Sequence, residues 1–201
     1  TTISNYSNNE LESFNAPFRH SKVLGLIDNT DSSILNSIAT VTMAKKFTPT
    51  LSSSTSYNFN LNNKFYNPVS GYNATNGGII ASTGFYQNSV TTTEYYFDDD
   101  GAGNIRTYYN VGGTTRTYVN STAGTINYST GLITIPSLTI ATTVNTNSIQ
   151  VVTQPKSNDI VPVRNQLLEI DFANSTVTAE VDTIESGGSS AGTGYNTTSS
   201  Y

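Results

Sequence analysis

Residues 56–66 alternate large apolar and polar side chains along the chain, and this pattern constrains the fold more than any other feature of the sequence. Tyr57, Phe59 and Leu61 alternate with three asparagines. A β-strand with one face in a core and the other in water produces such an alternation, because successive side chains point to opposite faces. The pattern predicts an antiparallel sheet with one solvated face.

Comparable segments recur through most of the chain. Alternation and β-branched or aromatic enrichment predict strands over 39–48, 56–66, 78–86, 93–98, 104–109, 115–119, 124–128, 132–135, 147–153, 166–172 and 175–184. Asp100-Gly101, Gly112-Gly113 and Ser129-Thr130-Gly131 separate neighbouring segments, and these residue types favour tight reversals. The predicted fold class is mainly β, made of antiparallel sheets and hairpins, with α+β as the alternative.

One region near the N-terminus has helical spacing. Residues 21–27 and 32–38 place apolar side chains three and four positions apart, and Thr30 or Asp31 can cap the second stretch. Gly25 and the polar residues between the two stretches interrupt the pattern. We therefore expect two short turns of helix rather than one long helix.

The composition is that of a polar β protein. The 201 residues are 35% hydrophobic and 11% charged, against roughly 45–50% and 25% in typical domains, and Ser, Thr and Asn fill the difference. We expect four segments, in chain order: a polar N-terminal segment at 1–16, a small helical segment plus strands at 17–92, a hairpin-rich domain at 93–185, and a flexible Gly/Ser/Thr-rich tail at 186–201.

Composition also argues against several functional classes. No apolar run approaches the roughly 20 residues that cross a bilayer, so we expect no membrane partner. A net charge of −5 disfavours nucleic acid, whose phosphates need clustered Lys and Arg. The first twenty residues lack the apolar stretch of a signal peptide and there is no initiator Met, so we expect a processed chain or a piece of a longer one.

The sharpest local motif is the acidic, glycine-rich run that begins at Asp98. Asp98, Asp99, Asp100 and Asn104 are candidate ligands for Ca²⁺, which takes six to eight oxygen atoms. The bidentate Glu that ends a helix-loop-helix calcium site is missing, because the sequence returns directly to a strand. We favour a hairpin loop whose Asp and Gly residues supply backbone hydrogen bonds and positive φ angles, with calcium binding as the alternative.

Catalysis has little support in the sequence. His20 is the one histidine, it lies in no nucleophile-elbow context, and without Cys it cannot complete a zinc site. Glu169 with Asp171, and Glu180 with Asp182, could form the carboxylate pair of a glycosidase, but we favour acids that alternate on a solvated strand and discourage edge pairing. We expect no enzyme, no catalytic residue, no cofactor and no small-molecule substrate.

Aromatic residues supply most of the large side chains, with 13 Tyr, 8 Phe and no Trp. Those around the central hairpins are candidates for an interface with another protein, because tyrosine is enriched at protein contacts. They are Tyr95, Phe97, Tyr108, Tyr109 and Tyr118. For Tyr95, Phe97, Tyr108 and Tyr109 we favour burial in the core, with the interface as the alternative.

Two stretches carry motifs of a known family. Ser21–Pro49 reads SKVLGLIDNTDSSILNSIATVTMAKKFTP, with an Ile-Asp pair, a Ser-Ile/Leu turn and a basic strand that ends in Thr-Pro. Tyr95–Asp171 contains YYFDDDGAGNIRTYY, GTINYSTGLITI and SNDIVPVRNQLLEID. Together they resemble, over roughly residues 18–172, the C-terminal β-rich portion of the ring-forming baseplate wedge subunit (gene-product-six type) of T-even-like contractile-tailed bacteriophages.

This resemblance implies a structural role. Subunits of that family dimerise, alternate in a ring around the tail hub and bind neighbouring wedge proteins, and the ring widens when the sheath contracts. By resemblance, the expected partners are a second copy and other wedge proteins, in a virion baseplate assembled in the host bacterial cytoplasm. The alternatives are a secreted or surface β-sandwich that binds calcium or carbohydrate, and a glycoside hydrolase.

Overall fold

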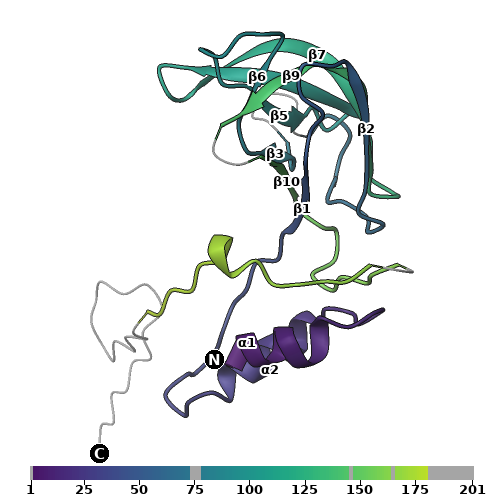
Figure 1. Cartoon of the computed structure of the whole chain (residues 1–201). Helices are drawn as coiled ribbons and strands as arrows, with labels where there is room; N and C mark the ends of the chain where they lie inside the picture. The colour runs from purple at the N-terminus through teal and green to yellow at the C-terminus, as the bar shows by residue number, and fades with distance from the viewer. Residues whose placement is uncertain (1, 73–77, 145–146, 164–165, 181–201) are drawn as a thin grey trace, which may run out of the picture. The chain divides into compact units, whose positions relative to one another are not determined.

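A computed structural model describes residues 2–72, 78–144, 147–163 and 166–180. The chain divides into two units, Thr1–Glu169 and Ile170–Tyr201. The first unit contains the strands and the N-terminal helices, and the described part of the second contains one short 3-10 helix (Figure 1). The predicted class, mainly antiparallel β with a short helical segment near the N-terminus, is confirmed.

Short helical elements form the N-terminal part of the first unit: α1 (Thr2–Tyr6), the π-helix η1 (Ser7–Leu11) and α2 (His20–Asp28). The polar residues 1–16 gave no prediction of a helix, yet Tyr6 and Leu11 are buried and anchor α1 and η1. Helix α2 continues through Gly25 and ends where the Asn29 side-chain amide donates to the Gly25 carbonyl at 2.6 Å.

The second predicted helical turn, at 32–38, is wrong, because residues 34–42 form neither helix nor strand. Asp31 Oδ1 accepts a hydrogen bond from the backbone N–H of Ser33 at 2.9 Å, and this local bond competes with helix formation. Leu35 and Ile38 are 71% and 93% exposed, so no packing within the chain supports a helix here.

The strands of the described residues form three sheets. They are β1 (Met43–Phe47), β2 (Thr55–Asn60), β3 (Ala81–Ser82), β4 (Phe85–Gln87), β5 (Tyr96–Asp99), β6 (Asn104–Val111), β7 (Thr115–Asn127), β8 (Leu132–Leu138), β9 (Ile140–Thr143) and β10 (Ile149–Thr153). The largest sheet is antiparallel and has the order β2-β8-β7-β6-β5.

Three successive hairpins build most of this sheet, and their turns lie where the sequence predicts them. Gly101, Gly112 and Gly131 have φ angles of 72°, 61° and 75°. Residues with a Cβ atom rarely adopt this region of backbone conformation. The teal and green ribbons of β6 and β7 in Figure 1 follow this hairpin succession. The predicted break between 115–119 and 124–128 is wrong, because β7 runs through both and register shifts beside Thr107 keep it paired with β6.

The two smaller sheets have the orders β1-β10-β3 and β4-β9. The strand predicted at 78–86 is therefore divided, since β3 and β4 pair with different partners. Strand β9 was not predicted from the sequence. In the described part of the C-terminal region, the strands predicted at 166–172 and 175–184 are wrong as far as residue 180; residues 181–184 and the predicted tail lie outside the described residues.

One hydrophobic core packs against these sheets, and aromatic and β-branched side chains dominate it. Tyr57, Phe59 and Leu61 are buried, as their alternation predicts. Other members are Phe65, Ile80, Phe85, Phe97, Ile105, Ile126, Ile133, Ile135, Ile140, Ile149 and Val151. The core holds β5 and β6 in place, and these strands carry most of the polar groups considered next.

Candidate functional site

The three aspartates of the acidic run occupy different environments. Asp98 and Asp99 lie within β5 and are fully buried, whereas Asp100 begins the turn into β6. Asp100 Oδ1 accepts hydrogen bonds from the backbone N–H groups of Ala102 and Asn104 at 2.7 and 2.9 Å, and Oδ2 accepts one from the Asn104 amide at 2.6 Å. Burial alone would raise the pKa of Asp100, but these hydrogen bonds outweigh burial and lower it.

Asp98 is the centre of a buried ion-pair cluster on one face of the large sheet. The β5–β6 register places it opposite Arg106, whose Nε donates to Asp98 Oδ1 at 2.8 Å. Arg116 Nη1 and the Tyr118 hydroxyl donate to Oδ2 at 2.7 and 2.9 Å. The side chains of Asp98 and Arg106 are 0% and 8% exposed and that of Arg116 is 36% exposed, so the cluster opens to solvent at Arg116.

Aromatic rings cover the guanidinium groups of this cluster. The Arg106 Cζ lies 4.1 Å from the centre of the Tyr118 ring, and the Arg116 Cζ lies 4.5 Å from the centre of the Tyr108 ring. These are cation–π distances, so each guanidinium group contacts an aromatic ring as well as the Asp98 carboxylate. Burial, followed by the contact with Asp98, raises the pKa of Tyr118.

The five predicted interface aromatics differ in exposure. Phe97 and Tyr108 are 1% and 7% exposed, and Phe97 packs in the core with its ring 4.6 Å from that of Phe85. Tyr95, Tyr109 and Tyr118 are half-buried. The structure thus leaves the last three with surface that another molecule can contact, while Phe97 lies within the hydrophobic core.

Asp99 points to the opposite face of β5 from Asp98 and binds neutral donors. Its Oδ1 accepts from the backbone N–H of Ile80 at 2.9 Å, and its Oδ2 accepts from the Tyr128 hydroxyl at 2.6 Å and the Gly101 N–H at 3.2 Å. Burial raises the pKa of Tyr128, and the adjacent Asp99 carboxylate raises it further. This contact joins β5 to the end of β7.

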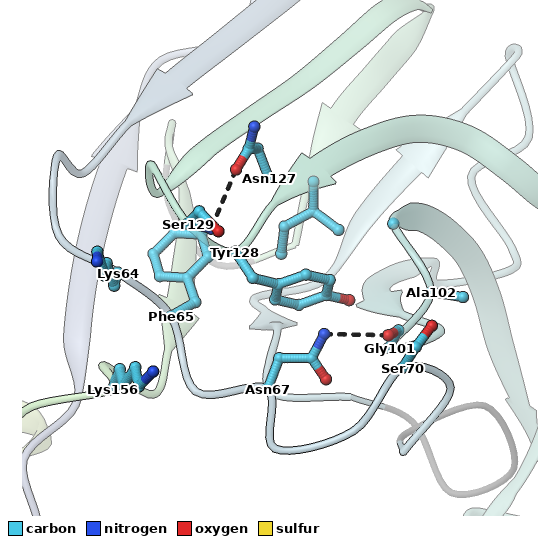
Figure 2. A pocket seen from close by; sticks show the side chains of 12 residues that line it. Lys64, Phe65, Asn67, Ser70, Gly101, Ala102, Asn127, Tyr128, Ser129 and Lys156 are labelled. Atoms are coloured by element: carbon cyan, nitrogen blue, oxygen red, sulfur yellow. Dashed lines mark hydrogen bonds between the residues drawn. The ribbon is translucent and has the colours of Figure 1, made fainter.

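A polar cavity of about 480 Å³ lies beside Tyr128 (Figure 2). Its lining comprises Lys64, Phe65, Asn67, Ser70, Gly101, Ala102, Gly103, Ile126, Asn127, Tyr128, Ser129 and Lys156. Lys64 and Lys156 lie on the same side of the cavity in Figure 2, and the Lys156 N–H donates to the Lys64 carbonyl at 2.8 Å. Sequence reasoning missed this site, because a long-range backbone hydrogen bond brings together two lysines that have no common local motif.

Of the residues considered for catalysis, His20 and Asp171 have hydrogen-bond contacts in the described structure. The backbone N–H of His20 donates to Asp159 Oδ1 at 2.9 Å, and its ring Nε2 lies 3.0 Å from the Ala39 carbonyl oxygen. Asp171 Oδ2 accepts a hydrogen bond from the Asn174 side-chain amide at 2.8 Å, and Asp182 is outside the described residues. Within the described ranges, no three His, Asp or Glu side chains are grouped so that they could hold a metal ion.

Exposed apolar side chains occur in the N-terminal part of the chain. Phe14, Leu35 and Ile38 are 73%, 71% and 93% exposed. Contiguous exposed apolar patches mark contact sites, whereas apolar side chains that are exposed singly are normal on protein surfaces. In the part of the chain that the structure describes, no helix has the length and apolar character needed to cross a membrane.

Comparison with known proteins finds a similarity in this N-terminal part. Residues 1–46 match the family model of baseplate structural protein gp6, C-terminal domain III, and they comprise α1, η1, α2 and most of β1. No curated protein sequence matches the chain. The match overlaps the first of the two stretches that predicted the family, and the second stretch lies beyond it. The predicted resemblance to a gp6-type phage baseplate protein is thereby confirmed over residues 1–46.

Proposed function

We propose that the chain is a structural subunit of a phage tail baseplate wedge and makes subunit–subunit contacts in the baseplate ring of a contractile tail. The observation that carries the proposal is the match of residues 1–46 to baseplate structural protein gp6, C-terminal domain III. The proposal includes association with a second copy and with other wedge proteins, and assembly in the host bacterial cytoplasm. No catalysed reaction is part of this role.

The exposed apolar side chains of the matched segment support a contact there. Leu35 and Ile38 lie in a stretch without helix or strand, and both are more than two-thirds exposed, at 71% and 93%. Burial of such side chains against another subunit removes apolar area from water at roughly 25 cal/mol per Å². Half-buried Tyr95, Tyr109 and Tyr118 offer a second contact region, of a residue type enriched at interfaces.

Self-association is tested by light scattering coupled to size-exclusion chromatography over a range of concentrations. A mass that rises above the 21.5 kDa of one chain is the expected result. The variant L35S/I38S should shift the association to higher concentration, because it removes exposed apolar area without altering the core. The control V69S/V111S changes side chains that are 66% and 51% exposed outside the matched segment and should associate like the original chain.

A single-chain mass at every concentration, up to hundreds of micromolar, contradicts the proposal of self-association. Equal effects of the two double variants contradict the location of the contact. Circular dichroism spectra of both variants should match that of the original chain, since the substituted side chains are solvent-exposed.

A further inference from the structure

The net charge of the chain is unevenly distributed along its sequence. Residues 1–164 contain nine Lys or Arg and nine Asp or Glu, whereas residues 165–201 contain five Asp or Glu and no Lys or Arg. The whole net charge of −5 therefore belongs to the C-terminal stretch. We name residues 165–185 the acidic segment; its carboxylates are Glu169, Asp171, Glu180, Asp182 and Glu185.

Lys64 and Lys156, in the first unit, have no matching carboxylate among the residues that the structure describes. Arg19 and Lys22 each bind an acidic side chain, and Arg106 and Arg116 share one. Lys64 and Lys156 have no such ion pair with any residue that the structure describes, and a backbone hydrogen bond holds their main chains side by side. Two adjacent, exposed cations thus border one cavity.

The cavity combines this charge with features that suit a peptide. Its volume of about 480 Å³ falls within the roughly 300–1,000 Å³ of ligand pockets. Tyr128 supplies a half-buried aromatic ring and Ser70 and Ser129 supply hydroxyl groups, whereas Phe65 and Ile126 are only 1% and 5% exposed. A free inorganic anion would use the lysines alone, whereas a peptide that carries apolar as well as acidic side chains would also contact the Tyr128 ring.

We propose that this cavity binds the acidic segment of a second copy of the chain, with its carboxylates against Lys64 and Lys156. The inference rests on the self-association in the proposed function and names one contact for it. The described residues 172–180 of the segment are exposed, and Phe172 and Val177 are 49% and 81% exposed, so apolar as well as acidic side chains are available. Opposite charges on the two surfaces favour this pairing over like-charged alternatives.

A labelled synthetic peptide of residues 166–186 tests the contact by fluorescence anisotropy with the full-length chain. The peptide should bind, and its affinity should fall as salt is added, because exposed ion pairs are screened. K64Q/K156Q should weaken binding about tenfold, the combined effect of two exposed ion pairs within their usual range. A peptide with all five acids replaced by their amides should lose affinity similarly.

The control K22Q/K45Q removes the same charge at lysines outside the cavity and should leave peptide affinity within twofold of the original. Equal binding of the acidic and amide peptides, equal effects of the two lysine variants, or no binding at all overturns the inference. These results leave the proposed function standing if the original chain still self-associates in light scattering. A chain that stays monomeric there overturns the proposed function whatever the peptide does.

Discussion

Asp98 and Asp99 are consecutive residues of β5 and are both fully buried, yet their carboxylates bind different donors on opposite faces of the sheet. Asp98 binds two arginines and a tyrosine hydroxyl, whereas Asp99 binds Tyr128 and two backbone N–H groups. Successive side chains of a strand point to opposite faces, so one short strand anchors two separate polar clusters. The consequences for stability can be measured at each cluster.

The substitution D98N should destabilise the chain by about 3–5 kcal/mol, because it removes the charge that balances two arginines in a buried setting. Arg106, with a side chain only 8% exposed, would be left without its carboxylate. Urea denaturation followed by circular dichroism measures the loss as a lower midpoint at an unchanged slope.

The matched control is D159N, which breaks the ion pair between Arg19 and Asp159. Those side chains are 53% and 38% exposed, so the expected loss is at most about 1 kcal/mol. If D98N and D159N shift the denaturation midpoint equally, the buried cluster does not have the energetic role that its geometry indicates.

Gly124 in β7 should not tolerate even a methyl group. A Cβ at this position would collide with the carbonyl oxygen of Thr134 in β8, which is backbone and cannot rotate away. G124A should therefore cost about 1–3 kcal/mol, typical of overpacking. G25A is the control: a Cβ at Gly25 in α2 meets nothing within 4 Å, and it should stabilise by about 0.4–1 kcal/mol. Thermal unfolding of both variants gives the comparison, and a neutral G124A would contradict the close approach of the two strands.

The parts of the fold that depend on local sequence could be predicted. The alternation around Tyr57 and the glycines at the turns Gly101 and Gly112 act within a few residues, so strands and hairpins follow from them. The predictions that were wrong concern segments whose structure depends on residues far away in the sequence. Residues 166–172 alternate like a strand, but alternation cannot show whether a neighbouring strand offers free backbone groups. The register shifts that let β7 continue through residues 120–123 also depend on its partner β6.

The acidic run shows the same limit at the candidate site. Its composition suggested three similar carboxylates, but their roles depend on where β5 ends. A signal was present: with the turn centred after Asp100, hairpin pairing places Asp98 opposite Arg106, and opposite charges at such positions form cross-strand pairs. The approach of Arg116 from β7 and the pairing of Lys64 with Lys156 required the three-dimensional structure.

Stability should decrease at alkaline pH because several tyrosines resist ionisation in the folded chain. Burial, followed by Glu94, raises the pKa of Tyr96 to about 12, and the pKa of Tyr128 is also raised. The stabilisation that each raised pKa contributes is fully present below the unfolded tyrosine pKa of about 10. It is lost as the pH rises toward the pKa of the folded state. Unfolding free energy measured between pH 8 and pH 12 should be flat and then fall above pH 10. In Y96F the fall should be shallower than in the control Y72F; identical curves would contradict the assignment to Tyr96.

Calcium titration should give no binding heat at millimolar Ca²⁺, although three aspartates follow one another in the chain. Asp98 is neutralised by Arg106 and Arg116, and both oxygens of Asp99 and of Asp100 already accept hydrogen bonds. A calcium ion needs six to eight oxygens and would have to displace these donors, including a guanidinium group. Isothermal titration of the chain and of D100N should give superimposable traces. Micromolar binding that D100N abolishes would instead favour the calcium-binding alternative and show that the loop can rearrange around a cation.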